Sequence, residues 1–157
     1  METYRASRRF TIIMFLLTAA SICFAFVHSA MPADMSDDES RGVVELFAWL
    51  FNALGIDMLT ADAIIRKLAH FTEFSVIGAM LTSCSYAFDR PRPHRFYAQV
   101  LLAGLVTAVI DETIQLGSQG RAGAVVDVII DFGGVLFGGL VMLAAYSIYR
   151  RIRGIKR

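Results

Sequence analysis

The chain contains four long apolar runs in which charged residues are few. They cover approximately residues 10–28, 63–87, 97–116 and 125–149. Each run is close to the roughly 20 residues that a helix needs to cross the hydrocarbon core of a bilayer. The pattern therefore predicts four transmembrane helices.

The first run also has two features of a signal peptide, a basic start and the sequence Ala-Met-Pro-Ala at residues 30–33. The apolar region of a signal peptide usually has only about 7–15 residues. Because residues 10–28 form a longer run, we interpret them as a retained helix.

The segment between the first two runs begins with an acidic stretch and continues with apolar residues 43–54. This apolar piece is too short to span a bilayer and contains Trp49, as membrane-surface helices often do. We expect an interfacial helix over about residues 41–54, or alternatively a lid packed on the bundle. The predicted fold is an all-α, polytopic membrane protein: a four-helix transmembrane bundle with this additional extracytoplasmic helix.

Composition supports a membrane protein and excludes other classes. Hydrophobic residues make up 56% of the 157 residues, and the mean hydropathy is +0.57. A soluble protein of this size could not bury so much apolar surface, and two cysteines are too few for a disulfide-stapled secreted fold. The length indicates a single domain over residues 1–157.

The basic residues are distributed unevenly along the chain. Eleven of the 15 Lys and Arg residues lie in the N-terminal segment, the loop at residues 89–95 and the C-terminal tail. Short cytoplasmic segments carry an excess of Lys and Arg. We therefore predict a multi-pass protein of the cell membrane with both termini in the cytoplasm and residues 28–61 outside it.

The polar residues inside the runs are expected to form one layer near the outer boundary of the membrane. His70 and Glu73 have i,i+3 spacing, whereas Asp111 and Gln115 have i,i+4 spacing, so each pair shares a helix face. The full set of candidate ligand-binding residues is His70, Glu73, Asp111, Glu112, Gln115, Arg121, Asp127 and Asp131.

The fourth run places its acids on the same face as a stripe of small residues. Asp127 and Asp131 are followed on that face by Gly134 and Gly138, which permit close approach of another helix. These carboxylates are thus predicted to point into the bundle. A charge at the bilayer centre costs about 2.5–3.5 kcal/mol on insertion scales, and such residues usually mark function.

A purely structural role is the alternative for these residues. In that interpretation His70 pairs with an acid, Asp127 caps the fourth helix, and Arg121 is a counter-ion for the acids. The excess of carboxylates favours a functional site. His70, Glu73 and Asp127 are the candidates for a divalent metal, and a mixed imidazole–carboxylate set suits Zn²⁺ or Mn²⁺ better than Ca²⁺.

Two blocks of the sequence resemble the VanZ-like family. Residues 67–78, Lys-Leu-Ala-His-Phe-Thr-Glu-Phe-Ser-Val-Ile-Gly, are similar to its K-x-x-H-F-x-E-Y-x-x-L-G block. Residues 111–134 resemble its D-E-x-x-Q…R-x-G…D-V-x-x-N-x-x-G block. The resemblance covers about residues 66–139, with two departures. Phe74 replaces a frequent Tyr, which removes a hydroxyl, and Asp131 replaces a common Asn, which adds a possible ligand.

The resemblance implies a four-helix bacterial membrane protein. The founding member of the family confers low-level resistance to the glycopeptide teicoplanin without remodelling the terminal dipeptide of the peptidoglycan precursor. All the candidate residues named above match polar positions of the family, Asp131 with the stated change.

Three functions follow as hypotheses. The first is binding of a lipid-linked envelope precursor or a glycopeptide-type amphiphile at the outer leaflet, with Arg121 holding a phosphate or carboxylate. The second is a membrane-embedded, metal-dependent hydrolase or transferase, in which His70 or a carboxylate acts as general base. The third is a structural or assembly subunit. The expected partners are the lipid bilayer and such an amphiphile, and not nucleic acid.

Overall fold

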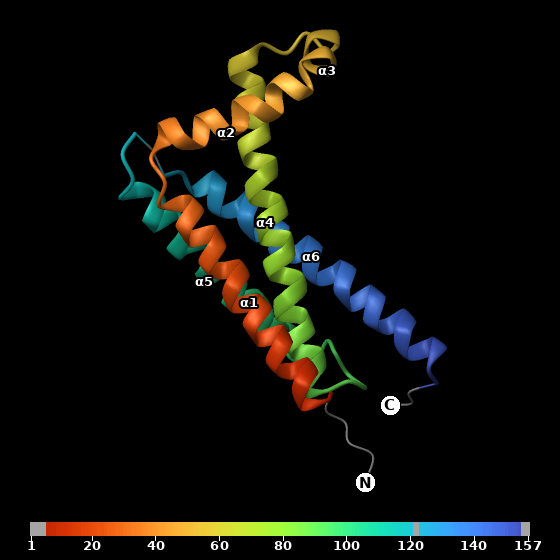
Figure 1. Ribbon diagram of the computed structural model, residues 1–157. Coiled ribbons are helices and arrows are strands. Elements are labelled where there is room, and N and C mark those ends of the chain that lie inside the picture. The colour runs from red at the N-terminus through yellow and green to blue at the C-terminus, as the bar shows by residue number, and fades with distance from the viewer. Residues whose placement is uncertain (1–5, 121–122, 155–157) are drawn as a thin grey trace.

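The computed structural model describes residues 6–120 and 123–154, except for the side chains of residues 34 and 36–39. The regular elements of the described chain are all helices (Figure 1). They are α1 (Arg8–Ser29), α2 (Ala33–Leu46), α3 (Ala48–Ala53), α4 (Met58–Phe88), α5 (Tyr97–Leu116) and α6 (Val125–Ile152).

Helix α4 is the central element, because it contacts α1, α2, α5 and α6. The main hydrophobic core lies between α4 and the three other long helices. Its buried members are Ala25 of α1, Phe74 and Ile77 of α4, Ala108 of α5 and Val135 of α6. All four long helices therefore contribute to one core.

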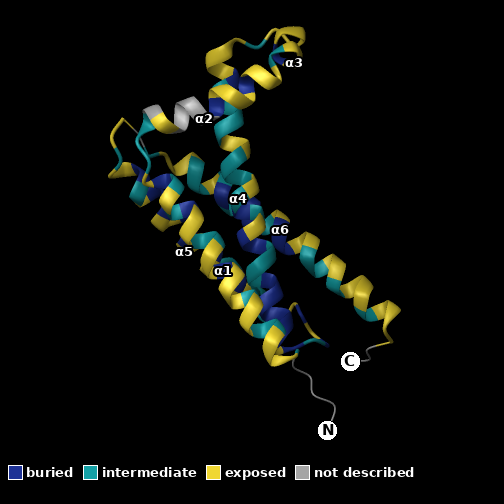
Figure 2. Ribbon diagram, viewed as in Figure 1, coloured by how far each residue is buried: buried dark blue, intermediate teal, exposed yellow. Residues whose placement is uncertain are grey.

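Three of the helices, α1, α5 and α6, are long and apolar enough to cross a membrane. Many residues of these helices are exposed (Figure 2), and they include the large apolar residues Leu16, Leu102 and Phe137. Helix α4 has 31 residues, which corresponds to a length of about 46 Å, but its composition does not place it in this group. The described part of this membrane protein is thus all-helical and has three candidate spans, and a fourth crossing by α4 stays a prediction.

The predicted helix bounds are accurate for α5 and less so for α4. Helix α5 covers residues 97–116 as expected, whereas α4 begins at Met58, five residues before the predicted start. The cause is Asp57, whose side chain accepts hydrogen bonds of 3.0 Å from the backbone N–H groups of Leu59 and Thr60. The hydrogen bond from the Thr60 hydroxyl lowers the pKa of this carboxyl. Asp57 thus caps the helix and extends it toward its N-terminus.

The segment expected to hold one helix over residues 41–54 contains two, α2 and α3, separated at Phe47. The break lets both helices fold back onto the start of α4, where Val44, Phe51 and Ala61 form a second small core. The acidic stretch that precedes residue 41 belongs to α2. Trp49 remains 69% exposed. Both helices thus pack on α4, and their roles as a lid or as membrane-surface helices stay predictions.

The glycine stripe of α6 is confirmed as a site of close helix approach. A Cβ atom added to Gly138 would overlap the backbone carbonyl of Ser75, and one added to Gly134 would meet the carbonyl of Phe71. From the other side, Gly78 of α4 faces the backbone of Val135 in the same way. The α4–α6 contact is therefore made backbone to backbone.

The start of α1, the 89–96 loop and the end of α6 lie at one end of the bundle (Figure 1). Helices α2 and α3 lie near the opposite end. This arrangement agrees with the predicted topology, in which both termini are on one side of the membrane. That this side is the cytoplasm stays a prediction.

The topology predicts opposite accessibility for the two ends of α4. In a background with Cys23→Ala and Cys84→Ala, we expect a membrane-impermeant maleimide to label Asn52→Cys in intact protoplasts. It should label His94→Cys only after permeabilisation, since residue 94 lies in the loop predicted to be cytoplasmic. Both positions are exposed in the structure. Equal labelling of the two variants in intact protoplasts would show that α4 does not cross.

Candidate functional site

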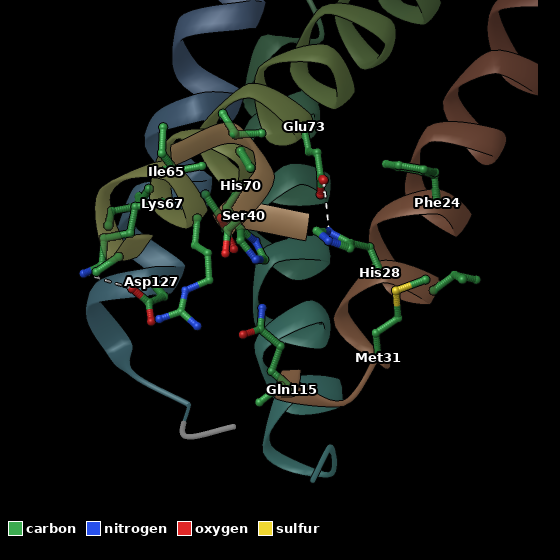
Figure 3. A pocket seen from close by; sticks show the side chains of 18 of the residues that line it. Phe24, His28, Met31, Ser40, Ile65, Lys67, His70, Glu73, Gln115 and Asp127 are labelled. Carbon is green, nitrogen blue, oxygen red and sulfur yellow. Dashed lines mark ion pairs between the residues drawn. The ribbon is translucent and has the colours of Figure 1, made fainter. Parts of the chain in front are cut away.

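A cavity of about 600 Å³ lies where α1, α2, α4 and α6 meet, with Gln115 of α5 at its edge (Figure 3). Part of its lining is apolar and comes from residues such as Phe24, Val27 and Ile130. The rest is polar or ionisable, namely His28, Ser40, Arg66, Lys67, His70, Glu73, Gln115, Asp127 and Asp131. The cavity is therefore amphiphilic.

His70 is the centre of a three-residue group that joins α4, α5 and α6. Its Nδ1 lies 3.6 Å from Oδ1 of Asp131 and 3.9 Å from Oδ2 of Asp111. Asp111 and Asp131 are fully or almost fully buried, at 0% and 1% exposure. One donor atom from each of the three residues lies within 4.8 Å of the others. We call these three residues the His70 group.

Asp111 is held in place by two neighbours. Ser29 Oγ donates a 2.7 Å hydrogen bond to Asp111 Oδ2, and Gln115 Nε2 donates another of 3.0 Å to the same oxygen. Gln115 was expected in the site, whereas Ser29, the last residue of α1, was not. The contact shows that the end of α1 belongs to the polar layer.

Glu73 points toward α1 and not into the His70 group. Its Oε1 lies 3.1 Å from His28 Nδ1, as the dashed line in Figure 3 shows. The His28 ring in turn stacks on the His70 ring, with 6.1 Å between the centroids. His28 was not among the expected site residues. Its position at the outer end of the first apolar run is the signal that would have placed it at the depth of His70.

Asp127 and Glu112 interact away from the His70 group. Asp127 Oδ1 lies 3.5 Å from Lys67 Nζ (Figure 3), and Glu112 Oε1 accepts a 2.5 Å hydrogen bond from the backbone N–H of Ala124. Ala124 is the N-cap residue of α6 and Asp127 lies in its first turn, so the side chain of Asp127 does not cap the helix. Arg121 lies outside the described residues.

The expected metal trio of His70, Glu73 and Asp127 is thus not the one that converges. Glu73 lies beside His28 and Asp127 lies beside Lys67, about one helical turn along α4 and α6 from His70 and Asp131. Among the residues that the structure describes, Asp111 and Asp131 take their places beside His70.

Several buried carboxylate oxygens of this layer accept no hydrogen bond within the described part of the chain. They include both oxygens of Asp131, Oδ1 of Asp111 and Oε2 of Glu73. A buried polar atom without a partner costs about 1–3 kcal/mol, more for a charged group. A layer that served only to hold helices together would gain stability by satisfying these atoms. Donors from outside the chain, such as water or a ligand, would satisfy these atoms.

Comparison with protein-family models matches residues 12–147 to the family described as VanZ/LLP1. The chain belongs to the VanZ/LLP1 family. Searches of curated proteins and of solved structures gave no significant match.

The part of the chain that matches VanZ/LLP1 extends from α1 to α6 and contains every candidate site residue. Within it, the two sequence blocks that resemble the family meet in space. The block at residues 67–78 supplies His70, and the block at residues 111–134 supplies Asp111 and Asp131. In this VanZ/LLP1 protein the two blocks that resemble the family in sequence thus contribute to one polar layer.

Proposed function

We propose that this VanZ/LLP1 membrane protein binds an amphiphilic ligand of the cell envelope, a lipid-linked precursor or a glycopeptide-type molecule, at the outer leaflet. The observation that carries the proposal is the cavity of about 600 Å³ with one apolar and one ionisable part. Its volume lies within the 300–1,000 Å³ range typical of small-molecule sites. Such a site accommodates a head group and part of a hydrocarbon chain together.

The ionisable part of the cavity offers partners for both kinds of head-group charge. The carboxylates of Glu73, Asp127 and Asp131 accept hydrogen bonds from amines and sugar hydroxyls. Lys67 is half exposed at the cavity and is suited to a phosphate or carboxylate. We keep Arg121 as a further candidate for this anionic contact.

The apolar part of the cavity suits the hydrocarbon portion of the ligand. Phe24 and Val27 of α1 line it and are themselves 63% and 62% exposed. Helix α1 is a candidate membrane span, so these side chains lie at the boundary between the cavity and lipid. A chain that enters from the bilayer would remain in an apolar environment. The outer-leaflet location depends on the predicted orientation of the termini.

The proposal predicts that binding depends on the acyl chain of the ligand. We expect teicoplanin to bind the protein in lipid nanodiscs at least about tenfold more tightly than its deacylated form, because each buried methylene contributes about 0.8 kcal/mol. Titration followed by intrinsic fluorescence measures both affinities, with empty nanodiscs to subtract partitioning into lipid. Undecaprenyl phosphate serves as the probe for a lipid-linked ligand. If neither amphiphile binds above the empty-nanodisc level, the proposal is wrong.

A metal-dependent hydrolase or transferase acting on a lipid-linked substrate is the second candidate. The observation that favours it is the His70 group, two members of which, His70 and Asp131, line the same cavity. There His70 or a carboxylate would serve as general base. Turnover of a bound lipid-linked substrate into a new product would distinguish this function from binding alone. A structural or assembly role is the third candidate, and the unpartnered carboxylate oxygens argue against it.

A further inference from the structure

We propose that His70, Asp111 and Asp131 bind one divalent transition-metal ion, Zn²⁺ or Mn²⁺. The three residues come from three different helices and place one donor atom each within 4.8 Å of the others. The proposal does not depend on amphiphile binding, since it concerns only these three residues, of which His70 and Asp131 line the cavity.

The separations within the His70 group are somewhat longer than those of atoms around a shared ion. At 3.6 and 3.9 Å, the contacts of His70 Nδ1 with Asp131 and Asp111 are longer than a hydrogen bond, which measures about 2.7–3.2 Å. Two donors bonded to one Zn²⁺ at about 2.0–2.2 Å with tetrahedral angles lie roughly 3.3–3.6 Å apart. Small side-chain shifts suffice to bring the three donors to an ion.

Asp131 provides independent evidence for a missing partner. Its carboxylate is 99% buried, it lines the cavity, and neither oxygen accepts a hydrogen bond from any described residue. Asp111 Oδ1 is also buried and accepts no hydrogen bond from a described residue. A divalent cation would be a partner for these oxygen atoms and would balance the two negative charges.

The neighbours of the group resemble the outer shell of a metal site. Ser29 and Gln115 both donate to Oδ2 of Asp111, which orients the carboxylate beside His70, while Oδ1 accepts no hydrogen bond from a described residue. The His28 ring stacks on the ring of His70 and lies beside Glu73. Outer-shell contacts of this kind fix the direction in which ligands point.

The chemistry of the donors selects the type of ion. One imidazole with two carboxylates suits Zn²⁺ or Mn²⁺, whereas Ca²⁺ and Mg²⁺ prefer oxygen ligands alone. Three protein ligands leave at least one coordination position open. Since His70 and Asp131 line the cavity, this position is available to water or to an oxygen atom of a head group.

Metal analysis of the purified protein tests the site. Protein without a polyhistidine tag is stripped with a chelator, incubated with Zn²⁺ or Mn²⁺ and desalted, and its metal content is measured by mass spectrometry. We expect one ion per chain for at least one of the two metals. Asp131→Asn and His70→Gln should each reduce the metal affinity at least about tenfold, because the first removes the negative charge of a ligand and the second replaces the imidazole by a weaker amide donor.

Asp127→Asn is the matched control for metal binding, since Asp127 lies one turn away on α6 but is paired with Lys67. It should retain the ion. An equal loss in Asp127→Asn and Asp131→Asn would indicate general attraction of cations by acids and overturn the proposal, as would a wild-type protein that binds neither metal.

If the ligand variants do not fold, Zn K-edge X-ray absorption of the wild-type protein tests the site instead. Nitrogen and oxygen neighbours with imidazole scattering support the site, and a sulfur shell contradicts it.

Discussion

Gly138→Ala is expected to destabilise the protein, although alanine normally stabilises a helix relative to glycine by about 0.5–1 kcal/mol. The added Cβ would overlap the backbone carbonyl of Ser75 in α4. A backbone atom cannot rotate away as a side chain can, so α4 and α6 must separate. We expect a loss of about 1–3 kcal/mol in the free energy of unfolding, the range for overpacking. Unfolding by SDS in mixed micelles measures it.

Gly133→Ala is the control, because Gly133 belongs to the same helix but does not face the backbone of α4. A Cβ at this position would lie 3.8 Å from the ring of Phe71, an ordinary van der Waals contact. We therefore expect Gly133→Ala to leave stability unchanged or to raise it slightly. Equal destabilisation by the two variants would mean that the backbone contact between α4 and α6 does not determine stability.

The glycine contact also explains how the site is positioned. Gly134 packs against the carbonyl of Phe71, the residue that follows His70 in α4. Asp131 lies three residues before Gly134 in α6, and its carboxylate reaches His70. Close approach of the two backbones thus brings a short Asp side chain into range of the imidazole. A larger residue at Gly134 would move the two helices, and the two ligands with them, apart.

The depth of the polar residues could be predicted from the sequence, because helix rise converts residue number into position along the membrane normal. His70 and Asp131 were therefore expected in one layer, and they are in contact. The start of α4 was less predictable, since the cap formed by Asp57 lies before the apolar run.

The partners of the residues within the layer could not be predicted in the same way, because they depend on how each helix is rotated about its axis. Helix α1 is apolar all round, so no stripe shows which of its sides faces the bundle. The contacts of His28 with Glu73 and of Ser29 with Asp111 were missed for this reason. His70 and Glu73 share a helix face, but they are three residues apart and contact different neighbours: His70 lies beside Asp131, and Glu73 lies beside His28.

Ala69→Trp is expected to weaken binding of the amphiphile at least about tenfold. This is the largest functional effect that we predict for a residue without an ionisable side chain. Ala69 lines the cavity beside His70, and an indole there occupies volume that the ligand needs. A side chain that fills a preformed pocket prevents contacts between the ligand and the pocket wall, and the loss of these contacts lowers the affinity for the ligand. Teicoplanin titration in nanodiscs measures the effect, with the metal content as a second readout that should not change.

Leu68→Trp is the matched control for this variant. Leu68 precedes Ala69 in α4, is 54% exposed and does not line the cavity, so the same indole should leave the affinity unaltered. Ile130→Trp, introduced from α6, fills the cavity from another helix and replaces Ala69→Trp if that variant does not fold. Should both cavity variants fold and still bind teicoplanin as the wild type does, the ligand lies elsewhere on the protein. A loss confined to the cavity variants, with the metal retained, would place the amphiphile in this cavity and separate its binding from that of the ion.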